Sequence, residues 1–161
     1  MNLHKLFEMQ ITLDHRIETE HQLEGVPLFN KKILSLQVEL GELANETRCF
    51  KFWSTKESSS KDIILEEYVD CIHFILSLGL EKRFQNITLN VKNSTCELSL
   101  QFLNLYITIA NFATSASLDN YSSIFNNFLS LGQSLGFSED DIEAGYFYKN
   151  KINHERQDNG Y

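Results

Sequence analysis

Two pairs of carboxylates in this chain have a spacing that could hold metal ions. Glu39 and Glu42 are three residues apart, and so are Glu67 and Asp70. On an α-helix this spacing places both members of a pair on one face. Two antiparallel helices would bring the pairs together, and clustered carboxylate oxygens suit Mg²⁺. The spacing therefore predicts a site for two or more Mg²⁺ ions in a metal-dependent nucleotide hydrolase.

The residues around the pairs predict that the carboxylates lie close to a buried seam. The first pair adjoins the apolar stripe of a helix expected from Asn30 to about Phe50. The second pair projects from the middle of an apolar face in a helix expected from Asp62 to Leu80. Buried carboxylates are costly unless a metal, a basic partner or protons compensate them. The 62–80 segment contains no lysine or arginine, so metal binding is favoured over a structural ion pair.

Within such a cage the carboxylates would have different roles. Glu42 is the candidate to orient or deprotonate an attacking water, while Glu39, Glu67 and Asp70 act chiefly as metal ligands. A di-iron site is the competing interpretation, but it requires Glu-x-x-His motifs, and here the residue at that spacing from Glu67 is Asp70. His73 could support a ligand or be an ordinary core residue, and the second interpretation is favoured.

The helices that must position these pairs are predicted from apolar periodicity. A single proline and seven glycines leave few breaks, which favours helices over strands. Helices are expected at about Leu3–Leu23, Asn30–Phe50, Asp62–Leu80, Glu97–Ser115 and Leu118–Leu135, with a last one after the capping-box pattern at Ser138. The asparagine-rich connection 81–96 is expected to be a loop. We therefore predict one all-α domain over residues 1–161, a bundle of about six helices.

Composition and charge exclude several classes of partner. The formal net charge of −8 argues against a nucleic-acid polymer, because phosphate contacts need a basic surface. No apolar run approaches the roughly 18–20 residues of a membrane span, so no membrane association is expected. Met1–Glu8 lacks the features of a signal peptide, and three widely spaced cysteines indicate neither disulfides nor a zinc site. A cytoplasmic location is expected.

Two other polar groups have helical spacing but an open interpretation. Gln10 and Asp14 share one face of the first helix, and their pattern alone favours ordinary surface residues. Lys149, Asn153 and Arg156 are four and three residues apart, so they also share a face. These two cations and the amide could meet an anionic ligand or decorate a solvated tail. The pattern alone favours the tail.

The stretch after the second helix mixes aromatic and basic residues. It runs from Phe50 to Lys56 and includes Lys51 and Trp53. One interpretation is a helix end capped by lysines and packed by aromatics. The other is a platform on which a base stacks, with nearby cations that contact phosphates.

Taken together, these motifs resemble the all-α NTP pyrophosphatases, the superfamily of MazG-like enzymes and dimeric dUTPases. Agreement over nearly the whole chain narrows the resemblance to the dimeric dUTPase family. The matching motifs are Met9-Gln10 with Leu13-Asp14, the stretch Glu42–Trp53, Glu67-Tyr68-Val69-Asp70 followed by His73-Phe74-Ile75, and Lys149-x-x-x-Asn153-x-x-Arg156-Gln157-x-x-Gly160-Tyr161. The last motif is the most specific, because MazG-like relatives generally lack it.

The resemblance implies a homodimer, with a four-helix catalytic core in each chain, that hydrolyses dUTP, and usually dUDP, to dUMP with Mg²⁺. The metal ligands carried over by position are Glu39, Glu42, Glu67 and Asp70. The resemblance also implies that Gln10 and Asp14 lie near the base or deoxyribose and Asn153 near the uracil edge. The resemblance therefore changes the interpretation of Gln10 and of the C-terminal face formed by Lys149, Asn153 and Arg156. Both are now interpreted as functional.

The remaining carried-over residues concern the phosphates and the base. Lys149 and Arg156 would contact the phosphates, as would a lysine of the 51–56 stretch, Lys51 or Lys56. Trp53 is the aromatic expected to stack on uracil. The polar C-terminal motif could be a segment that closes over the nucleotide when phosphate contacts order it.

Other functions remain open on the sequence alone. A MazG-like or dCTPase-like pyrophosphohydrolase with another base specificity would use the same carboxylates. A non-catalytic helical interaction protein could retain the cage as a structural site. Dimeric dUTPases of phage origin contact regulatory proteins, so a bacterial or phage source would admit such a partner as well.

Overall fold

The computed structural model describes residues 1–160. These residues form six α-helices joined by loops, which confirms the all-α prediction. They are α1 (Leu3–Glu20), α2 (Phe29–Thr47), α3 (Lys61–Glu81), α4 (Leu98–Thr114), α5 (Leu118–Ser134) and α6 (Glu139–Asp158). No strand is present in residues 1–160, and the 82–97 connection is a loop as predicted. Tyr161, the last residue of the C-terminal motif, lies outside the described part of the chain.

Several helix ends differ from the sequence-based prediction. The first helix ends at Glu20 rather than Leu23, and the second begins at Phe29 rather than Asn30. The second also ends at Thr47 instead of Phe50, because Arg48 adopts a left-handed conformation with φ of 57°. Apolar periodicity continues past such a point, so it cannot reveal where the backbone turns.

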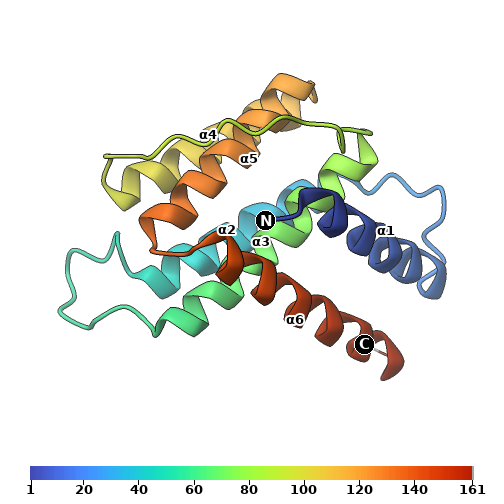
Figure 1. Ribbon diagram of the computed structural model, residues 1–161, viewed down its shortest axis with the longest axis horizontal. Coiled ribbons are helices and arrows are strands. Elements are labelled where there is room, and N and C mark those ends of the chain that lie inside the picture. The colour runs from blue at the N-terminus through green and yellow to red at the C-terminus, as the bar shows by residue number, and fades with distance from the viewer. Residues whose placement is uncertain (161) are drawn as a thin grey trace.

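The helices form pairs around α3. In Figure 1, α4 and α5 lie together above α2 and α3, while α1 lies to their right and α6 lies below them. The contacts agree with this view, since α3 packs against α1, α2, α5 and α6. The short connection 115–117 makes α4 and α5 antiparallel neighbours. The helix that carries Glu67 and Asp70 is therefore the central one.

The core is built on the second half of α3, where side chains are buried on every face. Tyr68, Cys71, Ile72 and Ile75 have no exposed surface. The first turns of α3 are more open, and Ile63 is 46% exposed there. Only the second half is covered on all sides by neighbouring helices.

The loop between α3 and α4 is fixed to the surface of α5. The Asn90 amide donates to the Asn126 side chain, and the Ser130 hydroxyl donates to the Lys92 carbonyl. These two bonds pair backbone groups of the loop that would lack partners if the segment were an isolated strand. None of the six described helices is both long enough and apolar enough to cross a membrane.

Candidate active site

Three carboxylates predicted as metal ligands converge between α2 and α3. Glu39 comes from α2, and Glu67 and Asp70 come from successive turns of α3. One oxygen from each lies within 4.8 Å of the other two. The helical spacing on α3 and the close packing of α2 against α3 produce this convergence. Hard cations such as Mg²⁺ are held by oxygen groups of this kind.

The electrostatics of the three carboxylates are unfavourable without a cation. Partial burial, followed by the negative charges of Asp70, Glu42 and Glu67, raises the pKa of Glu39 to about 7. Burial also raises the pKa values of Glu67 and Asp70. Like charges so close resist simultaneous ionisation. A bound divalent cation would reverse this effect, so the residues present fit a metal.

Glu42 occupies the edge of this group rather than its centre. Its side chain is exposed, and it is not one of the three converging carboxylates. Its charge nevertheless contributes to the raised pKa values of Glu39 and Glu67, which places it close to both. The structure thus brings together three of the four predicted carboxylates and leaves the fourth beside them.

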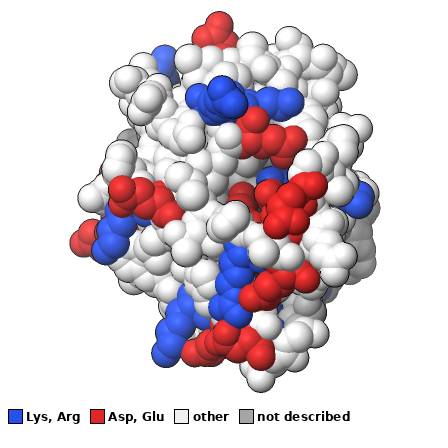
Figure 2. Space-filling model, turned by 90° about the vertical axis from the view of Figure 1, so that its right-hand side faces the viewer, with Lys and Arg blue, Asp and Glu red and all other residues white. Residues whose placement is uncertain are grey.

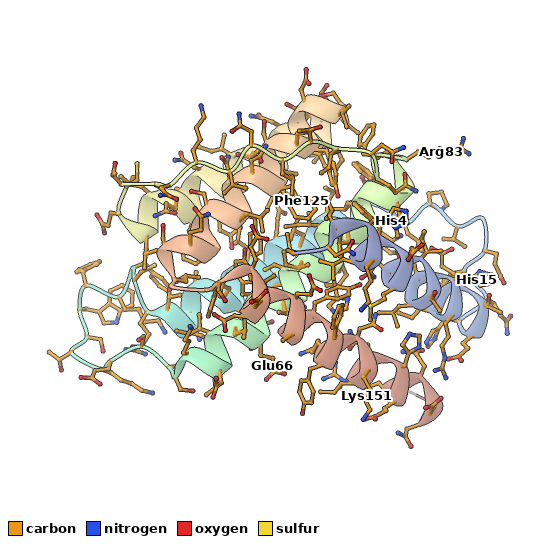
Figure 3. All side chains as sticks on the ribbon, in the orientation of Figure 1. His4, His15, Glu66, Arg83, Phe125 and Lys151 are labelled. Carbon is orange, nitrogen blue, oxygen red and sulfur yellow. The ribbon has the colours of Figure 1, made fainter. Side chains whose placement is uncertain are left out.

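The 62–80 segment itself has no basic residue, but α6 supplies one to the second pair. The Lys149 ammonium lies 2.6 Å from Asp70 Oδ2 and 2.9 Å from Glu66 Oε1, and Lys149 is only 5% exposed. Burial lowers the pKa of Lys149, but its bonds to the two carboxylates outweigh burial and raise it. Figure 3 shows Glu66 at the edge of α3 beside α6. In this conformation Lys149 neutralises carboxylates.

A cavity of about 290 Å³ opens beside the carboxylates. Four helices contribute to its wall, which includes four of the eight residues expected to bind substrate. The lining residues are Gln10, Leu13, Asp14 and Ile17 of α1, Glu39 of α2, Asp70, His73, Phe74 and Ser77 of α3, and Asn153, Arg156 and Gln157 of α6. Residues far apart in the sequence are therefore assembled in one place.

A hydrogen-bond network joins α1, α3 and α6 at this cavity. Gln10 is 3% exposed, and its Nε2 donates to Asp14 Oδ1 at 2.7 Å. Its Oε1 accepts from the Tyr146 hydroxyl at 2.8 Å and lies 2.8 Å from His73 Nδ1. Ser77 Oγ donates to Asp14 Oδ2 at 2.5 Å. The interpretation of Gln10 and Asp14 as ordinary surface residues is wrong.

Sequence reasoning missed His73, Ser77 and Tyr146 as members of this site. His73 and Ser77 follow Asp70 by three and seven residues, which places all three on one face of α3. That spacing could have identified the first two. Tyr146 has no comparable signal, because its position depends on how α6 packs against α1 and α3.

The aromatic and basic stretch after α2 lies apart from the cavity lining. Trp53 is 65% exposed and packs edge-to-face on Phe50 and Phe52. The Lys51 ammonium donates to the Asn45 side chain, and Lys56 is exposed. None of the three residues predicted here to bind substrate, Lys51, Trp53 and Lys56, lines the 290 Å³ cavity. Their roles stay predictions.

A second cavity, of about 460 Å³, adjoins the first through Asp14. Its wall includes Lys32, whose ammonium lies 3.8 Å from Asp14, 3.7 Å from Glu18 and 3.4 Å from Glu81. These pairs leave no excess of positive charge for an anionic ligand. Figure 2 shows the same alternation, with acidic and basic side chains interleaved over the visible face.

An all-α fold that gathers carboxylates and polar side chains at the wall of a cavity is the arrangement expected of a helical nucleotide hydrolase. The family is more specific: a model of the dUTPase family matches residues 2–161, so the chain belongs to the dimeric all-α dUTPase family. It is a dUTP diphosphatase, which hydrolyses dUTP to dUMP and diphosphate. The comparison with curated proteins gave no match.

Proposed function

We propose that this dUTPase hydrolyses dUTP, and also dUDP, with two or more Mg²⁺ ions held by Glu39, Glu67, Asp70 and Glu42. The observation that carries the proposal is the convergence of three of these carboxylates within 4.8 Å. Two of the three, Glu39 and Asp70, also line the cavity that would receive the nucleotide. The phosphates would lie toward the carboxylates, and the deoxyuridine would extend along α1, α3 and α6.

In this arrangement the carboxylates would hold the metal ions and accept a proton from the attacking water. When bound, Mg²⁺ would neutralise phosphate charge and lower the pKa of an attacking water. Glu42 is exposed at the edge of the group, where it can accept a proton from a water beside the phosphates. Glu39, Glu67 and Asp70 are more enclosed, which suits them to hold ions.

The other predicted residues divide by their distance from the carboxylates. Arg156 and Asn153 on α6 line the cavity, and we assign Arg156 to the phosphates and Asn153 to the uracil edge. We assign Gln10 and Asp14 on α1 to the base or deoxyribose. Lys149 would transfer from the carboxylates to a phosphate once Mg²⁺ replaces its charge. The 51–56 stretch would contact substrate only after a movement or from a second subunit.

The test is release of diphosphate and phosphate from dUTP, dUDP, dTTP and dCTP, with Mg²⁺ and with EDTA. We expect turnover of dUTP and dUDP that requires Mg²⁺. Glu42→Gln should lower kcat by roughly a hundredfold or more while KM changes little, because general-base catalysis supplies about that factor. The matched control is Glu46→Gln one turn further along α2, which should change neither constant strongly. Equal loss of kcat and binding in Glu42→Gln would contradict the assigned role.

We also propose that the enzyme is a homodimer that uses an apolar face of α2 and α4. Both helices expose large apolar side chains on their outer surfaces, which are Leu34 and Val38 on α2 and Leu100, Leu103 and Ile107 on α4. The two helices contact each other, and an apolar cavity of about 320 Å³ lies between them. Large exposed apolar side chains gathered on neighbouring helices favour an interface. The scarcity of charge on α4 supports the same proposal.

A further inference from the structure

The end of α6 carries three residues of the 290 Å³ cavity wall, but the core does not hold this end in place. The three residues are Asn153, Arg156 and Gln157. The buried side chains of α6 end at Asn150, and none of residues 151–158 is buried. Burial of apolar surface therefore fixes the first part of this helix and leaves its last two turns without that support. Another attachment is needed to keep the three side chains at the cavity.

Arg16 of α1 supplies such an attachment. Its guanidinium donates to the His154 carbonyl at 3.1 Å and to Asp158 Oδ1 at 2.7 Å, and we call these two bonds the Arg16 clamp. Its Nε donates to Glu20 Oε1 within α1 at 2.7 Å, which fixes the direction of the side chain. A planar guanidinium can form all these bonds at once, because its N–H groups have fixed directions. One side chain of α1 thus holds both the backbone and a side chain at the end of α6.

The charges at this end of the two helices increase the importance of Arg16. Figure 1 shows that α1 and α6 run in the same direction, and the N-terminal amine pairs with Glu139 at one end as Arg16 pairs with Asp158 at the other. The C-terminal ends of both helices, which carry partial negative charge, therefore lie together. Glu20 and Asp158 add two carboxylates there, and Arg16 bonds to both. Single exposed ion pairs contribute little, but a network on one arginine contributes more.

We propose that Arg16 is a positioning residue for nucleotide binding, because it keeps the end of α6 docked on α1 with Asn153 and Arg156 at the cavity wall. The inference rests on the proposed function, in which these two residues contact the uracil edge and the phosphates. Arg16 itself does not line the 290 Å³ cavity, so it acts through α6 and not by contact with substrate. His21 supports the same docking, since its Nε2 lies 3.0 Å from Gln157 Oε1.

Loss of the Arg16 clamp should weaken nucleotide binding and leave the chemical step unchanged. An undocked helix end must dock again before its side chains reach the nucleotide, so the apparent affinity falls with the docked fraction. Once bound, the nucleotide holds the helix end in place, and the carboxylates on α2 and α3 are unaffected. The KM for dUTP should therefore rise while kcat stays similar. A protein that was merely less stable would contain fewer active molecules, so its kcat would fall and its KM would not change.

Arg16→Met tests the clamp, because methionine keeps an apolar side chain on α1 and removes every bond of the guanidinium. Steady-state hydrolysis of dUTP with Mg²⁺ gives kcat and KM for the variant and the wild type. We expect KM to rise about tenfold, because most helix ends would be undocked before the nucleotide binds. The kcat value should stay within about threefold of the wild type.

Glu20→Gln is the matched control, since glutamine can still accept from Arg16 Nε and both bonds of the Arg16 clamp remain. Its KM should stay within about twofold of the wild type. A wild-type KM in Arg16→Met, or a fall in kcat without a rise in KM, would overturn the proposal. An equal rise of KM in Arg16→Met and Glu20→Gln would overturn it as well, because Arg16 would then act only within α1.

Hydrogen exchange of the wild-type backbone tests the docking of α6 even if a variant fails to fold. Without nucleotide, the amides of residues 155–158 should exchange at least about tenfold more slowly than in an unfolded chain, and about tenfold faster in Arg16→Met than in the wild type. Exchange of the wild type at the unfolded rate would overturn the proposal, because the helix end would then not be docked. Wild-type turnover of dUTP with an unchanged KM in Arg16→Met would refute this inference alone. No turnover by the wild type would refute the proposed function, and the inference would fall with it.

Discussion

At the scale of single residues, Asp70 combines two ways of compensating the charge of a buried carboxylate. It converges with Glu39 and Glu67, as a metal ligand would, and it also forms a short ion pair with Lys149. The ion pair satisfies the charge of Asp70, but Glu39 and Glu67 have no comparable partner from Lys149. Lys149 therefore offsets part of the negative charge, and the divalent cation proposed for this site would offset the rest.

This balance predicts the effect of removing the lysine. Lys149→Met should lower the free energy of unfolding without metal by about 3 kcal/mol, because breaking a buried ion pair leaves an uncompensated carboxylate. Saturating Mg²⁺ should restore part of the loss. Urea denaturation with EDTA and with Mg²⁺ measures both effects.

Lys151→Met is the control, because Lys151 is an exposed lysine on the same helix (Figure 3). It pairs with Glu155 at the surface, and such pairs contribute about 0.5 kcal/mol. A Lys149→Met protein as stable as Lys151→Met would show that the ion pair does not compensate Asp70.

Glu39 predicts a pH dependence of stability in the absence of metal. Its pKa rises from 4.5 to about 7 on folding, so the folded protein binds a proton more tightly than the unfolded chain does. The stability that Glu39 contributes is present below its pKa in the unfolded chain. It is lost as the pH rises through its pKa in the folded protein. Thermal unfolding in EDTA should therefore give a Tm that falls between about pH 5 and about pH 8, and less so in Glu39→Gln.

The control for this measurement is Glu57→Gln, an exposed residue in the loop after α2, whose Tm should fall as in the wild type. Mg²⁺ should raise the wild-type Tm more at the higher pH, because metal ligands must be deprotonated. A Tm that falls equally in Glu39→Gln and the wild type would contradict the assigned pKa shift.

Sequence reasoning could find the carboxylates but not the contacts that tune them. The spacing of Glu67 and Asp70 follows directly from helix geometry. The pairing of Lys149 with Asp70 depends on the packing of α6 against α3, which no local pattern encodes. The burial of His73 was also predictable, because its neighbours on α3 are apolar, but its contact with Gln10 of α1 was not.

At the scale of helices, close approach by glycine determines how tightly α3 packs against α5. A Cβ atom at Gly79 would lie 2.2 Å from the Tyr121 hydroxyl oxygen, which donates to the Ile75 carbonyl. Gly132 on α5 accommodates the Tyr68 ring in the same way. Tyr121 of α5 thus packs against Gly79 of α3, and Tyr68 of α3 packs against Gly132 of α5.

Gly79→Ala should lower the free energy of unfolding by about 2 kcal/mol, because overpacking outweighs the helix propensity of alanine. The matched control is Gly41→Ala on α2, where the nearest atom is the Tyr106 hydroxyl oxygen at 3.1 Å. This contact is much longer than the one at Gly79, although the Tyr106 hydroxyl donates to the Gln37 carbonyl, so Gly41→Ala should lose less stability than Gly79→Ala. Urea denaturation compares the two, and equal stabilities would contradict the packing argument.

Helix number and order were predictable because apolar patterns mark the first five segments and the capping box at Ser138 marks the sixth. Helix ends were not, and the end of α2 shows why. Arg48 turns the backbone into the left-handed region, and its guanidinium is held by the Lys56 carbonyl and the Ser54 hydroxyl. Such an ending depends on contacts with the following loop rather than on the residues of the helix.

At the scale of the whole molecule, α6 is an integral part of the bundle and not a polar tail. It packs against α1 and α3, and both Lys149 and Asn150 are buried. The N-terminal amine also pairs with Glu139 at the start of α6. The interpretation of the C-terminal face as a solvated tail is wrong. Removing residues after Tyr148 would damage the fold itself, so Asn153→Ala and Arg156→Ala test the proposed closure more cleanly.

The apolar face of α2 and α4 predicts a second property of the whole molecule. Leu103 is 57% exposed and lines the cavity between the two helices, so it would lie inside the proposed dimer interface. Leu103→Glu would place a charge in that interface, where burial without a partner is costly. Light scattering coupled to size-exclusion chromatography should therefore find a dimer for the wild type and a monomer for Leu103→Glu.

Leu118→Glu provides the matched control, because Leu118 is 44% exposed at the start of α5, outside the α2–α4 cavity. It should remain a dimer. Because the 48–60 loop follows α2 directly, a dimer through this face could also place Trp53 of each subunit near the other subunit. Monomeric Leu103→Glu should then lose dUTP turnover while keeping its helical content by circular dichroism. A monomeric wild type, or a dimeric Leu103→Glu, would exclude this face as the interface.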